Sequence, residues 1–112
     1  MNNCKKTINV ERLLNKYERV VQNICVGYED NIFEYKNDLC CRQKLQSFLE
    51  TGTDINYEFI ARVERADKEL KRVLVKTKEC IHGNYPETYF WLWGVPSNAD
   101  DMISLAKSNN WL

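Results

Sequence analysis

The stretch YPETYFWLWGVP, residues 85–96, carries five aromatic side chains among twelve residues. Its apolar residues occupy both odd and even positions, so it lacks the alternation that is typical of a half-buried strand. Pro86 suits the first position of a helix, and Gly94 suits the residue just after a helix ends. We therefore expect a short helix over residues 86–93, and the alternative is an extended conformation over residues 88–93.

This aromatic stretch is either buried core or an anchor left exposed for a partner. It is far too short to cross a bilayer, which takes roughly 20 consecutive apolar residues. A short helix that is apolar on nearly every side has to be covered by neighbouring elements. We therefore expect most of its rings to close one end of the core, and the open question is which of Tyr85, Tyr89 and Trp91 faces water.

Upstream of the aromatic stretch, apolar residues recur at helical spacing and predict three long helices. The first covers about residues 10–26, and the third covers about residues 56–80. The second covers about residues 29–51, and its apolar stripe shifts near residues 38–41, so the helix bends or breaks there. Downstream, a last, short helix is expected after Ser97, with Ala99, Met102, Ile103 and Ala106 on its inner face.

The expected helix ends follow from residues with special backbone or side-chain properties. Gly27 and Gly52 suit the ends of the first two helices, because glycine tolerates a left-handed backbone. Thr53 or Asp54 is expected to cap the third helix, and Ser97 the last one. The sequence thus predicts an all-α fold, a compact single-domain helical bundle of three long and two short helices that spans all 112 residues.

Charge and composition argue against several classes of function. Sixteen basic residues balance sixteen acidic ones, and a chain without a basic excess is not expected to bind nucleic acid generically. The N-terminus lacks the apolar stretch of a secretory signal, and no segment is long enough to span a membrane. Five cysteines, an odd number, are typical of reduced thiols. We expect a cytoplasmic protein without a membrane partner, and its twelve asparagines and ten lysines favour a bacterial, AT-rich genome.

Few residues are candidates for catalysis. The single histidine, His82, lies two residues after Cys80, and groups this close in sequence seldom converge as base and nucleophile. His82 fits the end of a long helix instead. Cys40, Cys41 and Cys80 have no CxxC spacing and are interpreted as core residues. No nucleotide, metalloprotease or hydrolase motif occurs, so we expect a protein that is not an enzyme and binds no cofactor or metal.

Asp67 is an acidic residue beside the apolar face of the third predicted helix. Val63 and Leu70 belong to that face, so one edge of Asp67 is expected to point inward. A buried carboxylate is costly without a partner. Asp67 is therefore either a structural acid, paired with Lys71 or with an arginine from a neighbouring helix, or an acid presented in a groove.

Charge is unevenly distributed along the chain. Residues 28–38, YEDNIFEYKND, hold four acidic residues against one lysine, whereas residues 1–27 and 62–80 each carry an excess of three basic residues. Such segments are commonly solvated helix faces. Acids interleaved with Tyr28 and Phe33 also suit a binder of a basic partner, because aromatic rings anchor a complex and charges steer its formation. The candidate partner-binding residues are Glu29, Asp30, Glu34, Tyr35 and Asp38.

The run ARVERADKELKRVL, followed by a turn and by YPETYFWLWGVP, resembles small bacterial immunity proteins of polymorphic and contact-dependent toxin systems. The resemblance covers roughly residues 59–96, and several such proteins are compact helical domains of about this size. It implies a protein that binds the toxin domain of its own system tightly and blocks it. Toxins of this kind are often basic nucleases, so the resemblance implies that the acidic segment would complement one.

Two other classes of function stay open. A structural or adaptor module, including a homodimer, would use exposed aromatic side chains. A small nucleic-acid-binding regulator would use the basic segment over residues 62–78. Neither pair of predicted helices has a convincing helix-turn-helix turn, so the regulator ranks last.

Overall fold

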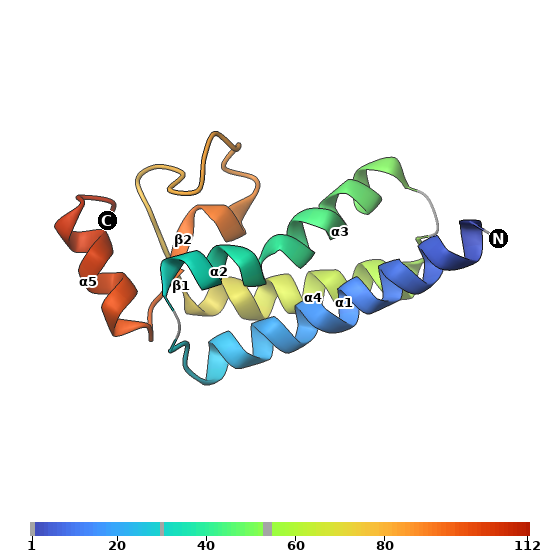
Figure 1. Cartoon of the computed structure of the whole chain (residues 1–112), viewed down its shortest axis with the longest axis horizontal. Helices are drawn as coiled ribbons and strands as arrows, with labels where there is room; N and C mark the ends of the chain where they lie inside the picture. Colours follow the sequence, from blue (N-terminus) through green and yellow to red (C-terminus); the bar gives the residue numbers. More distant parts are fainter. Residues whose placement is uncertain (1, 30, 53–54) are drawn as a thin grey trace.

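The computed structural model describes residues 2–29, 31–52 and 55–112 and is elongated, with principal extents of 49 × 28 × 21 Å (Figure 1). Its elements in chain order are α1 (Asn2–Val26), α2 (Ile32–Asp38), α3 (Cys40–Thr51), α4 (Tyr57–Val73), β1 (Leu74–Lys76), the 3-10 turn η1 (Phe90–Leu92), β2 (Gly94–Pro96) and α5 (Asp100–Ser108). The prediction of a mostly helical fold is confirmed. The prediction of an all-α fold is wrong, because β1 and β2 form a two-stranded antiparallel sheet.

Three helices form the main body of the molecule. α1 lies beside α4 with the same chain direction, and α3 packs against α1 in the opposite direction (Figure 1). The faces that meet carry apolar side chains at helical spacing, which buries one stripe of each helix. The core residues of these three helices include Leu14, Tyr17, Val21, Ile24, Cys41, Leu45, Phe59, Val63, Ala66 and Leu70.

The second predicted helix is broken, as its shifting stripe indicated. It divides into α2 and α3 at Leu39, and the Asn31 side chain caps α2 by accepting from two backbone N–H groups. The predicted stop at Gly52 is confirmed, since its φ of 68° is left-handed and suits glycine. α1 ends at Val26, directly before Gly27.

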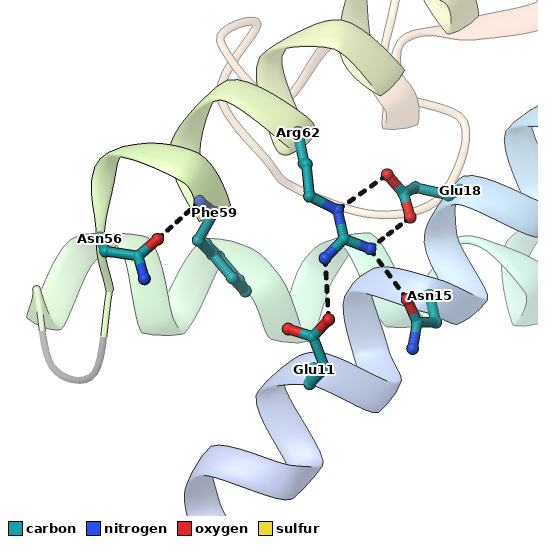
Figure 2. A network of polar contacts seen from close by, with 6 residues as sticks. All are labelled: Glu11, Asn15, Glu18, Asn56, Phe59 and Arg62. Carbon is teal, nitrogen blue, oxygen red and sulfur yellow. Dashed lines mark hydrogen bonds and ion pairs between the residues drawn. The ribbon is translucent and has the colours of Figure 1, made fainter.

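α4 is capped by Asn56, whose side-chain oxygen accepts from the Phe59 N–H at 2.8 Å (Figure 2). The two residues from which a cap was expected, Thr53 and Asp54, lie outside the described residues. The helix also ends earlier than predicted, at Val73 instead of near residue 80.

The backbone after α4 becomes extended because a partner strand is present. Val75 pairs with Val95, and the Thr77 N–H donates to the Trp93 carbonyl at 2.9 Å. β-branched side chains favour this extended backbone. The pairing joins the end of α4 to the aromatic stretch and explains why helical periodicity overestimated α4.

The aromatic stretch, residues 85–96, is not the short helix that we expected. Only the 3-10 turn η1 interrupts an otherwise irregular chain that ends in β2. Trp91 is 1% exposed and Tyr85 is 36% exposed, while Tyr89 is half-buried. The stretch therefore does contribute to the core, and Tyr85 is the most exposed of the three rings in question.

α5 packs against β2 and buries Met102 and Ala106. It begins at Asp100 and its N-cap is Ala99, so the predicted cap at Ser97 is wrong. Ser97 instead donates its backbone N–H to the Val73 carbonyl at 2.7 Å and extends the pairing of the two strands.

Candidate functional site

The predicted acidic segment lies at the junction of α1 and α2. Glu29 and Glu34 are exposed, whereas Asp38 is half-buried and accepts a hydrogen bond from the Tyr28 hydroxyl at 2.7 Å. Asp30 lies outside the described residues. The segment thus exposes the carboxylates of Glu29 and Glu34, which have no ion pair among the described residues, while Asp38 also has a structural role.

Tyr35 is a correction to the predicted site. Its ring is fully buried, packed edge-on against Tyr28 with centroids 5.5 Å apart, and it lies 6.1 Å from the ring of His82. Burial raises the pKa of the Tyr35 hydroxyl well above its ordinary value. Tyr35 therefore belongs to the core and is unable to contact a partner in this fold.

Two other apolar side chains at this junction are exposed. Phe33, in the first turn of α2, is 76% exposed, and Val26, the last residue of α1, is 84% exposed. They flank the linker that carries Glu29. Large apolar side chains beside acids are the composition of an anchored, electrostatically steered interface.

α5 adds acidic residues that sequence reasoning did not connect with this segment. One hollow of about 260 Å³ is lined by Val20, Asn23, Gly27, Tyr28, Glu29 and Asp38. A second, of about 340 Å³, is lined by Tyr28, Glu29, Asn98, Ala99, Asp100, Asp101 and Met102. Tyr28 and Glu29 line both, so the two hollows adjoin each other.

We call the carboxylates of these two hollows, Glu29, Asp38, Asp100 and Asp101, the acidic surface. No lysine or arginine is among the described residues that line either hollow. The Asn98 side chain donates to the Ile24 carbonyl at 2.9 Å and so holds the start of α5 beside the end of α1. This contact spans more than seventy residues, and no local pattern in the sequence indicates it.

Asp67 is held within the helical body by an arginine from a neighbouring helix. Arg42 of α3 donates to both carboxylate oxygens of Asp67 at 2.9 Å, and the Tyr17 hydroxyl donates to one of them at 2.5 Å. The Arg42 guanidinium also lies 4.0 Å from the centroid of the Trp91 ring. Of the two interpretations of Asp67, this geometry is that of the structural acid, since its side chain is 16% exposed and its partners surround it.

His82 lies in a turn and not at the end of a helix, which corrects our interpretation of it. It is buried, and burial together with the nearby charge of Lys36 lowers its pKa to about 4. Cys80 donates to the Leu92 carbonyl, and none of the described hydrogen bonds joins it to His82. The interpretation of the three cysteines as core residues holds for Cys41 and in part for Cys80, which is half-buried against the core, but it is wrong for Cys40, which is exposed.

Within the described residues, no group of three or more His, Cys, Asp or Glu side chains is arranged to hold a metal ion. The described helices likewise include none whose length and apolar character would allow it to cross a membrane.

Of the seven basic residues of the 62–78 segment, three form ion pairs within the described part of the chain, namely Arg62, Arg72 and Lys76. Arg62 donates to Glu11 and Glu18 of α1 and to Asn15 between them, at 2.6–3.1 Å (Figure 2). Arg72 pairs with Glu69, and Lys76 pairs with Glu87. The segment is also not one helix, because α4 ends at Val73.

Comparison of the chain with protein-family models, with curated proteins and with solved structures finds no significant match.

Proposed function

We propose that this chain is a non-catalytic binding protein whose acidic surface forms a tight complex with a basic protein partner. The observation that carries the proposal is the pair of adjoining hollows, in which carboxylates from the α1–α2 junction and from α5 come together. Complementary charge accelerates encounter and disfavours wrong partners. The exposed Phe33 and Val26, which flank the linker that carries Glu29, supply apolar area for a stable complex.

The partner that we propose is the toxin domain of a bacterial toxin system, and the chain would act in the cytoplasm as the immunity protein. The resemblance of residues 59–96 to such proteins supports this proposal. The described cysteines Cys25, Cys40, Cys41 and Cys80 are free thiols, which suits a reducing compartment. Inhibition would be stoichiometric, by covering the toxin's active site or a site it needs.

The direct test is to purify the tagged protein from its native cells and to identify what elutes with it. We expect one co-purifying toxin domain with a basic surface. If cells that produce such a toxin yield no bound protein, the immunity proposal is wrong.

The surface is tested by reversing charge in the hollows. The variant Glu29→Lys/Asp100→Lys/Asp101→Lys should bind the captured partner at least tenfold more weakly and with less salt dependence, because the field that steers the partner is inverted. A matched control, Glu58→Lys/Glu64→Lys/Glu79→Lys, changes net charge equally at exposed positions outside the acidic surface. If both variants lose affinity equally, or neither does, the partner binds elsewhere.

A homodimeric adaptor is the second candidate, because exposed Phe33 and Val26 could equally be covered by a second copy. Measuring the molar mass by light scattering over a range of protein concentrations distinguishes a homodimer from a monomer that binds a different protein. A mass that rises to twice the monomer and falls again in Phe33→Ser would favour the homodimer.

A further inference from the structure

A groove between α1 and α3 lies outside the acidic surface. It has a volume of about 490 Å³ and is lined by Arg12, Leu13, Lys16, Lys44, Ser47 and Phe48. Leu13 and Phe48 are half-buried, and the other four side chains are exposed. The groove therefore has an apolar floor, with cations contributed by both helices, and we call it the cationic groove.

The cations of this groove differ from several other basic residues of the body. Arg42 and Arg62 point their guanidinium groups at carboxylates of neighbouring helices. Arg12, Lys16 and Lys44 have no carboxylate within ion-pair distance among the described residues. None of the described residues that line the groove is acidic. Three like charges thus surround an apolar floor without compensation from the described part of the chain.

Two properties of the cationic groove specify its ligand. A volume near 490 Å³ falls within the range of about 300–1,000 Å³ that is typical of small-molecule sites. Leu13 and Phe48 favour an apolar body, because they remain partly in water when the groove is empty. Arg12, Lys16 and Lys44 favour a negatively charged head, and the Ser47 hydroxyl adds a hydrogen-bonding group near it.

The geometry points to the cationic groove as a binding site for a small anionic amphiphile, a molecule with a short aliphatic or aromatic body and one carboxylate or phosphate head. A single-stranded nucleic acid is less well matched, because it requires successive aromatic platforms along a basic track. Phe48 is the one aromatic side chain among the described lining residues. The inference is independent of the proposed function, since none of the described residues that line the groove also lines the hollows of the acidic surface.

The test uses the full chain and a ten-carbon carboxylate, decanoate, below its micelle concentration. Binding is measured by calorimetry and mapped by amide chemical shifts. We expect saturable binding with the largest shifts around Leu13 and Phe48. Decanol, which has the same tail without the charge, should bind at least tenfold more weakly.

Charge-reversal variants distinguish binding in the cationic groove from non-specific attraction of decanoate to basic residues elsewhere on the protein. Lys16→Glu/Lys44→Glu should weaken decanoate binding by about tenfold or more, since each exposed ion pair is worth up to about fivefold. The matched control is Lys68→Glu/Lys107→Glu, which changes net charge equally at exposed positions outside the groove and should bind decanoate as the parent does.

Four results would overturn the inference. They are equal affinity for decanol, equal losses in the two double variants, shifts that map instead to the hollow lined by Lys71, Leu74, Lys76, Glu87, Phe90 and Trp93, or absence of saturable binding. Displacement of decanoate from the groove by a short single-stranded oligonucleotide at equal or lower concentration would reassign the site to nucleic acid.

Discussion

Arg42 is the side chain on which α1, α3, α4 and η1 converge. It is 4% exposed, and it pairs with Asp67, donates to Gln46 at 3.0 Å and stacks on Trp91. A buried guanidinium is tolerated only when its donors are satisfied and a carboxylate balances its charge. Arg42 therefore acts as a core residue, although its residue type is normally found at the surface.

We predict that Asp67→Ala destabilises the protein by about 3 kcal/mol, because it leaves the Arg42 charge buried without its partner. Denaturant unfolding measures the change. The double variant Arg42→Met/Asp67→Ala should recover much of the loss, since no uncompensated charge remains.

Arg72 provides the control, because its pair with Glu69 is exposed on the same helix. Arg72→Ala should cost less than about 1 kcal/mol. If Asp67→Ala and Arg72→Ala lower the free energy of unfolding equally, the buried Arg42–Asp67 pair contributes no more to stability than an exposed pair does.

His82 is a second ionisable side chain that is buried, and unlike Arg42 it has no ion-pair partner among the described residues. Its Nε2 atom and the hydroxyl of Tyr35 are both buried without a hydrogen-bond partner among the described residues, and the two rings lie 6.1 Å apart. Because the fold favours neutral His82, its pKa is lowered from 6.5 to about 4. A buried polar group of this kind makes stability depend on pH.

We predict a loss of stability as the pH falls from about 7 to 5. The unfolded chain takes up a proton at His82 as the pH falls through 6.5, whereas the folded chain does so only near 4. Protons bound by the unfolded state favour unfolding, and the expected loss is on the order of 1 kcal/mol.

Urea unfolding at several pH values measures this dependence. His82→Gln should have a flatter profile between pH 7 and 5, because glutamine does not titrate. Parallel profiles for the parent and the variant would mean that other groups, such as carboxylates, account for the acid sensitivity.

At the scale of elements, local sequence patterns predicted where the long helices lie but did not predict which distant segments pack or pair with one another. Helical spacing of apolar residues correctly indicated α1 from residue 10 onward, most of α4, and the break that separates α2 from α3, but α1 begins at Asn2, eight residues earlier than predicted. These features depend on hydrogen bonds and side-chain contacts within a few residues of each other. The strand β1 was missed because its extended backbone depends on β2, about twenty residues later in the chain.

The cap of α4 gives a prediction at this scale. Asn56→Ala should destabilise the protein by about 1 kcal/mol, because the Phe59 N–H loses its acceptor. Asn56→Asp keeps an acceptor at the same place and should be close to neutral. Thermal unfolding measures both, and similar losses for alanine and aspartate would argue that the Asn56 side chain is not the cap in solution.

At the scale of the whole molecule, charge is separated although the net charge is zero. The carboxylates of the acidic surface come from the α1–α2 linker, the end of α2 and the start of α5, while the cationic groove lies between α1 and α3. α5 and the start of α1 lie at opposite ends of the long axis (Figure 1). Such separation allows partners of opposite charge to approach different surfaces of one small domain.

The reaction rates of two adjacent cysteines test whether the helical body stays folded in solution. Cys40 is exposed, whereas Cys41 is buried, and burial raises the pKa of its thiol to about 11. We predict that a thiol reagent at pH 8 modifies Cys40 within minutes and Cys41 only as the protein unfolds. The variants Cys40→Ser and Cys41→Ser, analysed by mass spectrometry, distinguish these adjacent residues.

The modification of Cys41 should accelerate with denaturant in parallel with global unfolding. The rates to compare, without denaturant, are those of Cys41 in the Cys40→Ser variant and of Cys40 in the Cys41→Ser variant. Equal rates would show that Cys41 is not buried in solution and would contradict the packing of α3 against α1.

The sequence by itself determined the helical character of the chain, the glycine stop at Gly52 and the exposed acids at Glu29 and Glu34. Each of these depends on residues within one or two helical turns, where the chain's own geometry sets the neighbours. Only the tertiary structure decided that Tyr35 is buried and that Asp100 and Asp101 join Glu29 in one surface. The physical reason is that burial and charge clustering arise from contacts between segments distant in sequence, and those contacts exist only when the chain is folded.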